Sequence, residues 1–183
     1  MSSPSSSAVV LEGLRSLIKS VEKPLLRERY PFTSTPLGIP KGCLIEIVGP
    51  GKTETVAQFL RENPNLRVAW IEDAFTIYPC AIMQRKIRLH QVLFIEAKQE
   101  NFWAASQVLR SGLFEIVVMS FQKQINEKVV RRLQLETEKA NVSFFLLPEN
   151  ENCSPVPSAS WPISMKLKMN ATNRGISILR ERG

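Results

Sequence analysis

The chain has 183 residues, of which 44% are hydrophobic, so it is long and apolar enough to build the core of one compact domain. No apolar run reaches 18 residues, and the serine-rich start lacks the basic and apolar regions of a secretory signal, which predicts a cytoplasmic protein without membrane spans. A formal net charge of +7 favours acidic partners or nucleic acid, although many soluble domains carry a similar charge.

Cysteine and histidine are too scattered along the sequence to suggest a metal site. Cys43, Cys80 and Cys153 are far apart, no two of them form a CxxC motif, and His90 is the single histidine. This set lacks the ligand spacing of metal-binding motifs, so we expect no bound metal. The three cysteines are expected to be buried thiols in a reducing compartment.

The amino-terminal region predicts one amphipathic helix. Residues 1–8 are rich in serine and are expected to be disordered. Apolar side chains then recur at intervals of three and four residues and form one stripe, until Pro24 ends or kinks the helix. The stripe either packs on its own domain or binds a partner, and both alternatives stay open. It consists of Val10, Leu11, Leu14, Leu17, Ile18 and Val21.

A polar, proline-marked linker is predicted at residues 25–40, between this helix and the rest of the chain. The expected division is therefore residues 1–35, which hold the disordered start, the helix and most of the linker, and a core domain at residues 36–183. The sequence shows no internal repeat and no second domain.

From Gly42 onward, short apolar runs alternate with helical segments. Continuous apolar strands separated by helices are typical of an α/β fold with a mostly parallel central sheet flanked by helices. Beyond a polar loop at 149–162, alternating apolar and polar side chains predict a terminal β-hairpin with strands at 163–170 and 176–179. The earlier strands are predicted at 43–48, 67–71, 92–95, 114–119 and 142–147, and the helices at 54–61, 79–88, 101–112 and 125–139.

The segment with the most chemical information lies between the first of these strands and its helix. The strand ends at Gly49, and Gly51, Lys52 and Thr53 open the helix, as in the phosphate-binding loop G-x-x-x-x-G-K-[ST]. Here only Pro50 separates the two glycines, so three residues of the loop are missing and the remaining one has no N–H donor.

Two interpretations of this short loop remain. Lys52 and Thr53 at a helix N-terminus still favour an anion, which leaves a weak phosphate contact open. The other interpretation is a tight strand-to-helix turn without a ligand. In either case the sequence predicts no tight nucleotide binding, and we expect no cofactor.

Three segments of the chain resemble RecA-type recombinases. They are residues 37–50, with the sequence LGIPKGCLIEIVGP, residues 68–79 and residues 109–120. In addition, residues 161–183, with Trp-Pro-Ile-Ser near the start and Gly-Ile-Ser-Ile before the end, are similar to the ImuA-like (SulA-like) group of bacterial damage-inducible RecA relatives. The resemblance spans roughly Pro36 to the carboxyl terminus and implies a RecA-like core.

The resemblance also implies that the parts needed for ATP hydrolysis are altered. The position of the catalytic glutamate falls on Ala74, which cannot orient or deprotonate a water molecule. The position of the magnesium-associated aspartate falls on Ser120, a neutral and weaker ligand. Glu72 and Asp73 lie close to Ala74, but their offset along the chain would misdirect a carboxylate. Together with the shortened loop, these changes predict a protein that is not an enzyme.

DNA binding is weakened in the same comparison. The family binds single-stranded DNA with two loops after the fourth and fifth core strands; here the first is nearly absent after Ser120, and the second, at 149–162, contains glutamates but no Lys or Arg. Basic residues gather instead on the last helix and the terminal hairpin, as a solvated face or as contacts for an acidic partner or DNA. They are Arg131, Arg132, Lys166, Lys168, Arg174, Arg180 and Arg182.

The function that the resemblance implies is a non-catalytic adaptor in the SOS response and translesion mutagenesis. It would contact the RecA recombinase, a polymerase-like mutagenesis protein, or both, and the amino-terminal helix is the candidate contact because RecA-type proteins assemble through such a helix. The alternative is a weak DNA-binding ATPase that uses Lys52 and Thr53. Two further alternatives are sequence-independent DNA binding by the basic hairpin and inhibition of cell division, the latter suggested by the SulA name alone.

Overall fold

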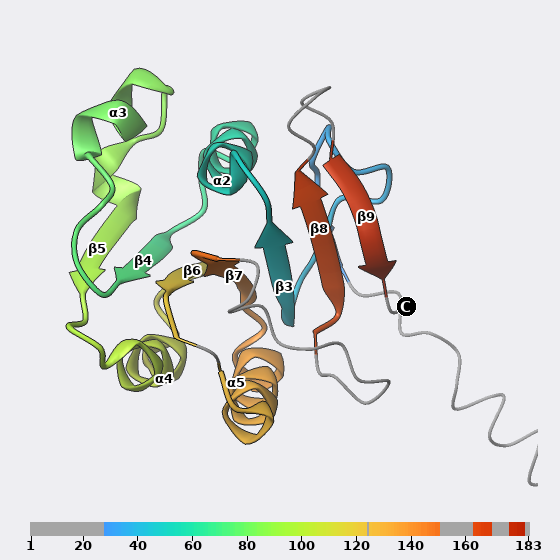
Figure 1. The fold of residues 1–183 in the computed structure, drawn as a ribbon. Helices are drawn as coiled ribbons and strands as arrows, with labels where there is room; N and C mark the ends of the chain where they lie inside the picture. Colours follow the sequence, from blue (N-terminus) through green and yellow to red (C-terminus); the bar gives the residue numbers. More distant parts are fainter. Residues whose placement is uncertain (1–27, 124, 151–162, 170–175, 182–183) are drawn as a thin grey trace, which may run out of the picture.

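The structure is a computed structural model that describes residues 28–123, 125–150, 163–169 and 176–181 (Figure 1). The predicted amino-terminal helix, with Leu11, Leu14, Leu17, Ile18 and Val21, lies outside the described residues, as do Arg174, Arg182 and Cys153. Within these ranges, no helix is long and apolar enough to cross a membrane.

Within the described residues the central sheet has seven strands, and its mostly parallel strands alternating with helices confirm the predicted α/β class. They are β3 (Cys43–Val48), β4 (Val68–Glu72), β5 (Val92–Glu96), β6 (Ile116–Phe121), β7 (Ser143–Pro148), β8 (Met165–Met169) and β9 (Ile176–Glu181). Their order across the sheet is β5-β4-β6-β7-β3-β8-β9 (Figure 1). All neighbouring strands run parallel except β8 and β9, which form the predicted terminal hairpin.

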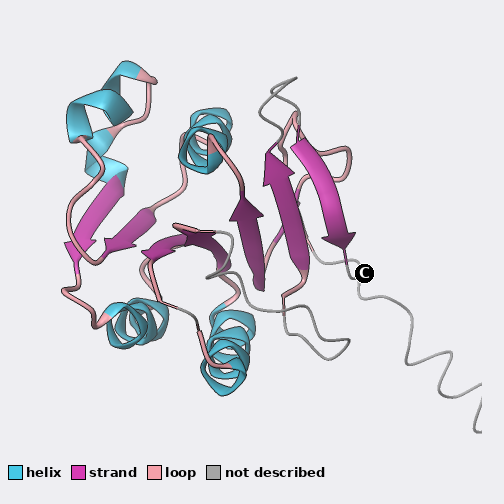
Figure 2. Ribbon diagram, viewed as in Figure 1, coloured by secondary structure: helices cyan, strands magenta, loops and turns pink. Residues whose placement is uncertain are grey.

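Helices cover both faces of this sheet, as expected for parallel strands (Figure 2). One face carries α2 (Lys52–Glu62), with α3 (Pro79–Gln84) and the short 3₁₀ helix η1 (Leu89–Gln91) beside β5; the other carries α4 (Asn101–Ser111) and α5 (Glu127–Ala140). The helix predicted at 79–88 ends earlier than predicted, at Gln84, and Lys86 beyond its end adopts a left-handed conformation with φ of 63°.

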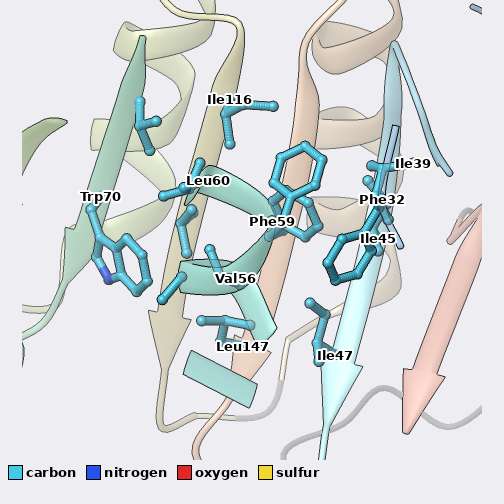
Figure 3. Packing of buried hydrophobic residues seen from close by; sticks show 14 of the residues in the cluster. Phe32, Ile39, Ile45, Ile47, Val56, Phe59, Leu60, Trp70, Ile116 and Leu147 are labelled. Carbon is cyan, nitrogen blue, oxygen red and sulfur yellow. The ribbon is translucent and has the colours of Figure 1, made fainter. Parts of the chain in front are cut away.

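The two faces of the sheet bury separate apolar clusters. On the α2 side, Ile45 and Ile47 of β3 belong to the same cluster as Phe59 of the helix and Trp70 of β4 (Figure 3). Leu44, which alternates with Ile45 along β3, belongs to the cluster under α4 and α5. Cys43 is buried on β3, whereas Cys80 is exposed on α3, so the prediction that all the thiols are buried is wrong for Cys80.

The linker predicted at residues 25–40 is packed against the core where the structure describes it. β1 (Arg29–Tyr30) and β2 (Ile39–Pro40) pair antiparallel, and the rings of Tyr30 and Phe32 meet Phe59 edge-on at centroid distances of 6.1 and 5.6 Å. Gly38 closes the turn with φ of 73°, and a Cβ there would lie 2.3 Å from the carbonyl oxygen of Tyr30. The compact region therefore begins before the predicted boundary at residue 36.

Candidate functional site

The turn after β3 lies at a place in the sheet where ligand sites often form. β3 and β7 are neighbours, but the strand that follows β3 in the sequence, β4, lies on one side of this pair, whereas the strand that follows β7, β8, lies on the other. In open α/β sheets, ligands bind outside the carboxyl ends of strands where the connections diverge in this way. A hollow of about 510 Å³ lies there, lined by residues 48–53 from the turn and 148–150 from the end of β7.

The backbone of the turn explains its two glycines. Gly49 and Gly51 have φ of 94° and 81°, a left-handed conformation that favours glycine, and Pro50 lies between them. Gly51 is the N-cap of α2, and its carbonyl oxygen accepts hydrogen bonds from the backbone N–H and the hydroxyl of Thr55 at 2.9 and 3.2 Å. Gly-Pro-Gly is therefore a tight strand-to-helix turn, and the helix begins at Lys52, two residues before the predicted start.

Lys52 is held by the main chain on the other side of the hollow. Its Nζ donates a hydrogen bond to the carbonyl oxygen of Pro148, the last residue of β7. Thr53, the next residue, is exposed. A phosphate that used this lysine would have to compete with the carbonyl of Pro148, and Pro50 offers it no N–H. Gly49, Gly51, Lys52 and Thr53, which were predicted as a degenerate nucleotide site, thus lie together. The ammonium group of Lys52 already donates a hydrogen bond to the main chain.

Ala74 and Ser120 lie at the same edge of the sheet but do not line this hollow. Ala74 is exposed in the segment after β4. Ser120 is the penultimate residue of β6, and its backbone oxygen accepts a hydrogen bond of 2.9 Å from the Asn101 side chain. The positions that the resemblance assigns to a catalytic glutamate and a metal-associated aspartate therefore carry neither carboxylate, and the structure does not bring them against Lys52.

The buried carboxylate of Glu72 organises the loop beside Ala74. It accepts hydrogen bonds from the backbone N–H groups of Thr76 at 2.8 Å and Ile77 at 3.1 Å, from the Thr76 hydroxyl at 3.1 Å, and from the indole of Trp70 at 3.2 Å. With four donors directed at it, this carboxylate has a structural role and is not placed to activate water.

Asp73, the second carboxylate near Ala74, is also used by the fold. Its side chain accepts a hydrogen bond of 3.1 Å from the backbone N–H of Gln99. Sequence reasoning did not assign these structural roles to Glu72 and Asp73. A glutamate that ends a buried strand, followed four residues later by Thr76, is the local signal that could have indicated the Glu72 loop.

The basic residues predicted as a partner surface have different environments. Lys166 forms an ion pair of 2.9 Å with Glu46, which is almost wholly buried on the adjacent strand β3, so Lys166 is not a freely displayed cation. Lys168 is half-buried on the same strand, and Arg131 is exposed on α5. Arg132 pairs with Glu136 at 3.3 Å. Arg180 belongs to β9, and its side chain is not among those described.

Among the residues that the structure describes, no three His, Cys, Asp or Glu side chains gather closely enough to hold a metal ion. A scan of the sequence against protein-family models finds no matching family, and a search of curated proteins finds no significant match. The geometry of the site is therefore the basis for assigning a function.

Proposed function

We propose that the protein is a non-catalytic adaptor with a RecA-like core, acting in the bacterial DNA damage response by binding other proteins. The observation that carries this proposal is the hydrogen bond from Lys52 to the carbonyl oxygen of Pro148 across a three-residue Gly-Pro-Gly turn. In a working phosphate loop the lysine reaches the nucleotide phosphates and several backbone N–H groups surround them. Here the lysine already has a partner and the proline removes a donor.

The surroundings of the turn support the same proposal. Hydrolysis of ATP requires a group that positions or deprotonates water and a ligand for the metal ion. Ala74 supplies no such group, and the carboxylate of the neighbouring Glu72 accepts hydrogen bonds from its own loop. Ser120 is the residue where a metal carboxylate would stand. The proposed RecA-like core without these groups would act by binding other proteins and not by hydrolysing ATP.

The proposed partners are the RecA recombinase and a polymerase-like mutagenesis protein, as the sequence resemblance implies. The proposed contact is the apolar stripe of residues 10–21, supported by its spacing and by its position ahead of the core. The structure defines where a deletion test should end, since Tyr30 and Phe32 are part of the core. A deletion of residues 1–27 keeps these two residues, whereas a deletion of residues 1–35 would remove them.

The test is co-purification of the full chain with purified RecA recombinase and, separately, with the polymerase-like protein. The double variant Leu14→Ala/Ile18→Ala should lose at least about tenfold in affinity, as expected when central apolar anchors are truncated. The matched control, Arg15→Ala/Lys19→Ala, has the same spacing on the polar side of the predicted helix and should bind like the wild type. Equal binding by both variants, or no binding by the wild type, would contradict this assignment of the contact.

The alternative function is a weak DNA-binding ATPase. One observation favours it: the hollow of about 510 Å³ beside Lys52 and Thr53 lies within the size range of small-molecule sites. This alternative requires a nucleotide to displace the Pro148 carbonyl from Lys52 and to compensate for the missing N–H donors. A nucleotide titration separates the two functions.

A further inference from the structure

α4 and α5 lie side by side on the sheet face opposite α2 (Figure 1), and residues of both helices line a groove between them. It consists of two adjoining hollows of about 310 and 530 Å³, and Arg110 lines both of them. The first lies between the amino-terminal halves of the helices and the second between their carboxyl-terminal halves, because the two helices run in the same direction. We call this surface the α4–α5 groove, and its principal lining residues are Phe102, Trp103, Arg110, Arg132, Leu133 and Lys139.

The apolar part of the groove includes a tryptophan that the fold does not bury. Leu133 is buried and Phe102 half-buried, and both belong to the apolar cluster under the helices. Trp103 lines the same hollow but is 64% exposed, whereas Trp70 in the sheet is 1% exposed. An indole left in water forgoes much of the stabilisation that burial would give. Tryptophan is also among the residues that contribute most to binding when a partner covers them.

The charged part of the groove is cationic. Arg110, Arg132 and Lys139 line it together with a single carboxylate, Glu136. Glu136 receives hydrogen bonds of 3.2 Å from Arg110 and 3.3 Å from Arg132. Burial alone would raise the pKa of Glu136, but hydrogen bonds from Ser106 and the two guanidiniums outweigh it and lower the pKa, so Glu136 is ionised at neutral pH.

The two guanidiniums keep donors for a partner. Arg110 and Arg132 are 57% and 66% exposed, and the hydrogen bond of each to Glu136 uses one of the five N–H donors of its guanidinium. Three cations against one carboxylate leave the groove with a formal charge of +2. An apolar floor with a displayed tryptophan, bordered by arginines, therefore complements an apolar and acidic surface.

We propose that the α4–α5 groove is the docking surface for an acidic amphipathic helix of a protein partner. This inference rests on the proposed adaptor function and names the chemistry of its partner. A helix suits the site because the groove follows two parallel helices, of which α4 spans 11 residues, and apolar residues on one face of a docked helix would cover Phe102, Trp103 and Leu133. A nucleic acid backbone fits less well, since it offers nothing apolar to the floor and would meet the carboxylate of Glu136.

The probe is a synthetic 16-residue helical peptide with leucine and phenylalanine on one face and glutamate on the other. It is titrated into the full-length chain while the indole N–H signal of Trp103, assigned with Trp103→Phe, is followed by NMR. Saturable binding that weakens with salt is expected, together with a shift of that signal. Trp103→Ala and the double variant Arg110→Ala/Arg132→Ala should each weaken binding at least about tenfold, the size of a hot-spot effect.

Two matched controls separate the groove from general surface effects. Arg131→Ala removes an exposed cation of α5 that does not line the groove. Leu135→Ala removes an apolar side chain of α5 that is 60% exposed and does not line the groove either. Both should bind the acidic peptide within about twofold of the wild type, as expected for residues outside the interface. A thermal melt of every variant establishes that the fold is intact.

Several outcomes would overturn the docking proposal. They are no binding of the acidic peptide, equal binding of the same peptide with lysine in place of glutamate, tighter binding of a single-stranded oligonucleotide at the groove, or no effect of Trp103→Ala. These outcomes are distinguishable from failure of the adaptor function. If RecA recombinase binds the wild type and the Trp103→Ala variant equally well, the adaptor acts through another surface and only the groove is rejected.

Discussion

The hollow beside the Gly49–Thr53 turn and the α4–α5 groove both contain cations, but they differ in what those cations bind. At the turn, Lys52 is bonded to the carbonyl oxygen of Pro148 in the same domain. In the groove, Arg110 and Arg132 share one carboxylate and remain more than half exposed beside an exposed Trp103. At the turn, the lysine has its hydrogen-bond partner within the domain. The groove instead leaves apolar area and hydrogen-bond donors facing solvent.

This difference shows why a motif and a site should be assessed separately. The Gly-Lys-Thr sequence attracts attention because it matches part of a phosphate loop, yet its lysine stabilises the carboxyl end of β7. The groove carries no motif, because its residues come from two helices and meet only in the folded chain. We therefore expect substitution of the cation at the turn to lower stability, and substitutions in the groove to weaken binding.

The largest loss of stability is expected for Lys166, because its ion-pair partner Glu46 is buried. Lys166→Met would leave Glu46 buried on β3 without its ion-pair partner at 2.9 Å. Removing one member of a buried pair costs about 3 kcal/mol, so the free energy of unfolding in urea should fall by that amount. Lys128→Met, at an exposed position of α5, is the control and should change stability by less than about 0.5 kcal/mol. An equal effect of both variants would show that Lys166 behaves as a surface cation.

A smaller effect is expected at the turn. Lys52→Met removes the hydrogen bond to the Pro148 carbonyl and should lower the free energy of unfolding by about 1 kcal/mol, the usual contribution of one such bond. Chemical denaturation measures the difference. Unchanged or increased stability would indicate that Lys52 is available for a ligand, as in a nucleotide-binding loop.

The carboxylate in the groove should make stability depend on pH. Because the pKa of Glu136 is lower in the folded chain than its ordinary value of 4.5, its contribution is present above that value and is lost as the pH falls through the folded pKa. Glu136→Gln should therefore be less stable than the wild type at neutral pH, by about 1 kcal/mol or less, and the two should converge in acid. Denaturation in urea at stepped pH tests this, and a difference independent of pH would contradict it.

The smallest effect on stability is expected for Trp103→Ala, the substitution that should strongly weaken binding of the acidic peptide. Trp103 is 64% exposed, so Trp103→Ala should change the free energy of unfolding by less than about 0.5 kcal/mol. A loss of several kcal/mol, measured by denaturation, would mean that Trp103 serves the fold like Trp70. The contrast between the turn and the groove would then disappear.

The main strands and helices were predictable because each carries a strong local signal. β3 was predicted with its observed bounds, since a parallel strand buried on both faces is a nearly continuous apolar run, here interrupted by Glu46. α5 begins after Asn126, whose side chain accepts a hydrogen bond of 2.9 Å from the Lys128 backbone N–H, a cap that also has a sequence signature. The terminal hairpin was predictable from the alternation along β8.

The features that were missed depend on contacts between distant residues. β1 and β2 have two residues each, too few to show a periodic pattern, and Phe32 becomes part of the core only by packing on Phe59. The pairing of Glu46 with Lys166 depends on the register of β3 against β8. The α4–α5 groove depends in the same way on how two helices lie side by side, which no local pattern specifies.

The measurement that tests the central claim most directly is an equilibrium titration of the full chain with a fluorescent ATP analogue and Mg²⁺. A non-catalytic adaptor with Lys52 bonded to Pro148 should show no saturable binding up to about 100 µM nucleotide, corresponding to a binding free energy weaker than about −5.5 kcal/mol. The Lys52→Met variant should give the same flat titration. Saturable micromolar binding that is lost in Lys52→Met would contradict the proposal and establish the Gly49–Thr53 turn as a working nucleotide site.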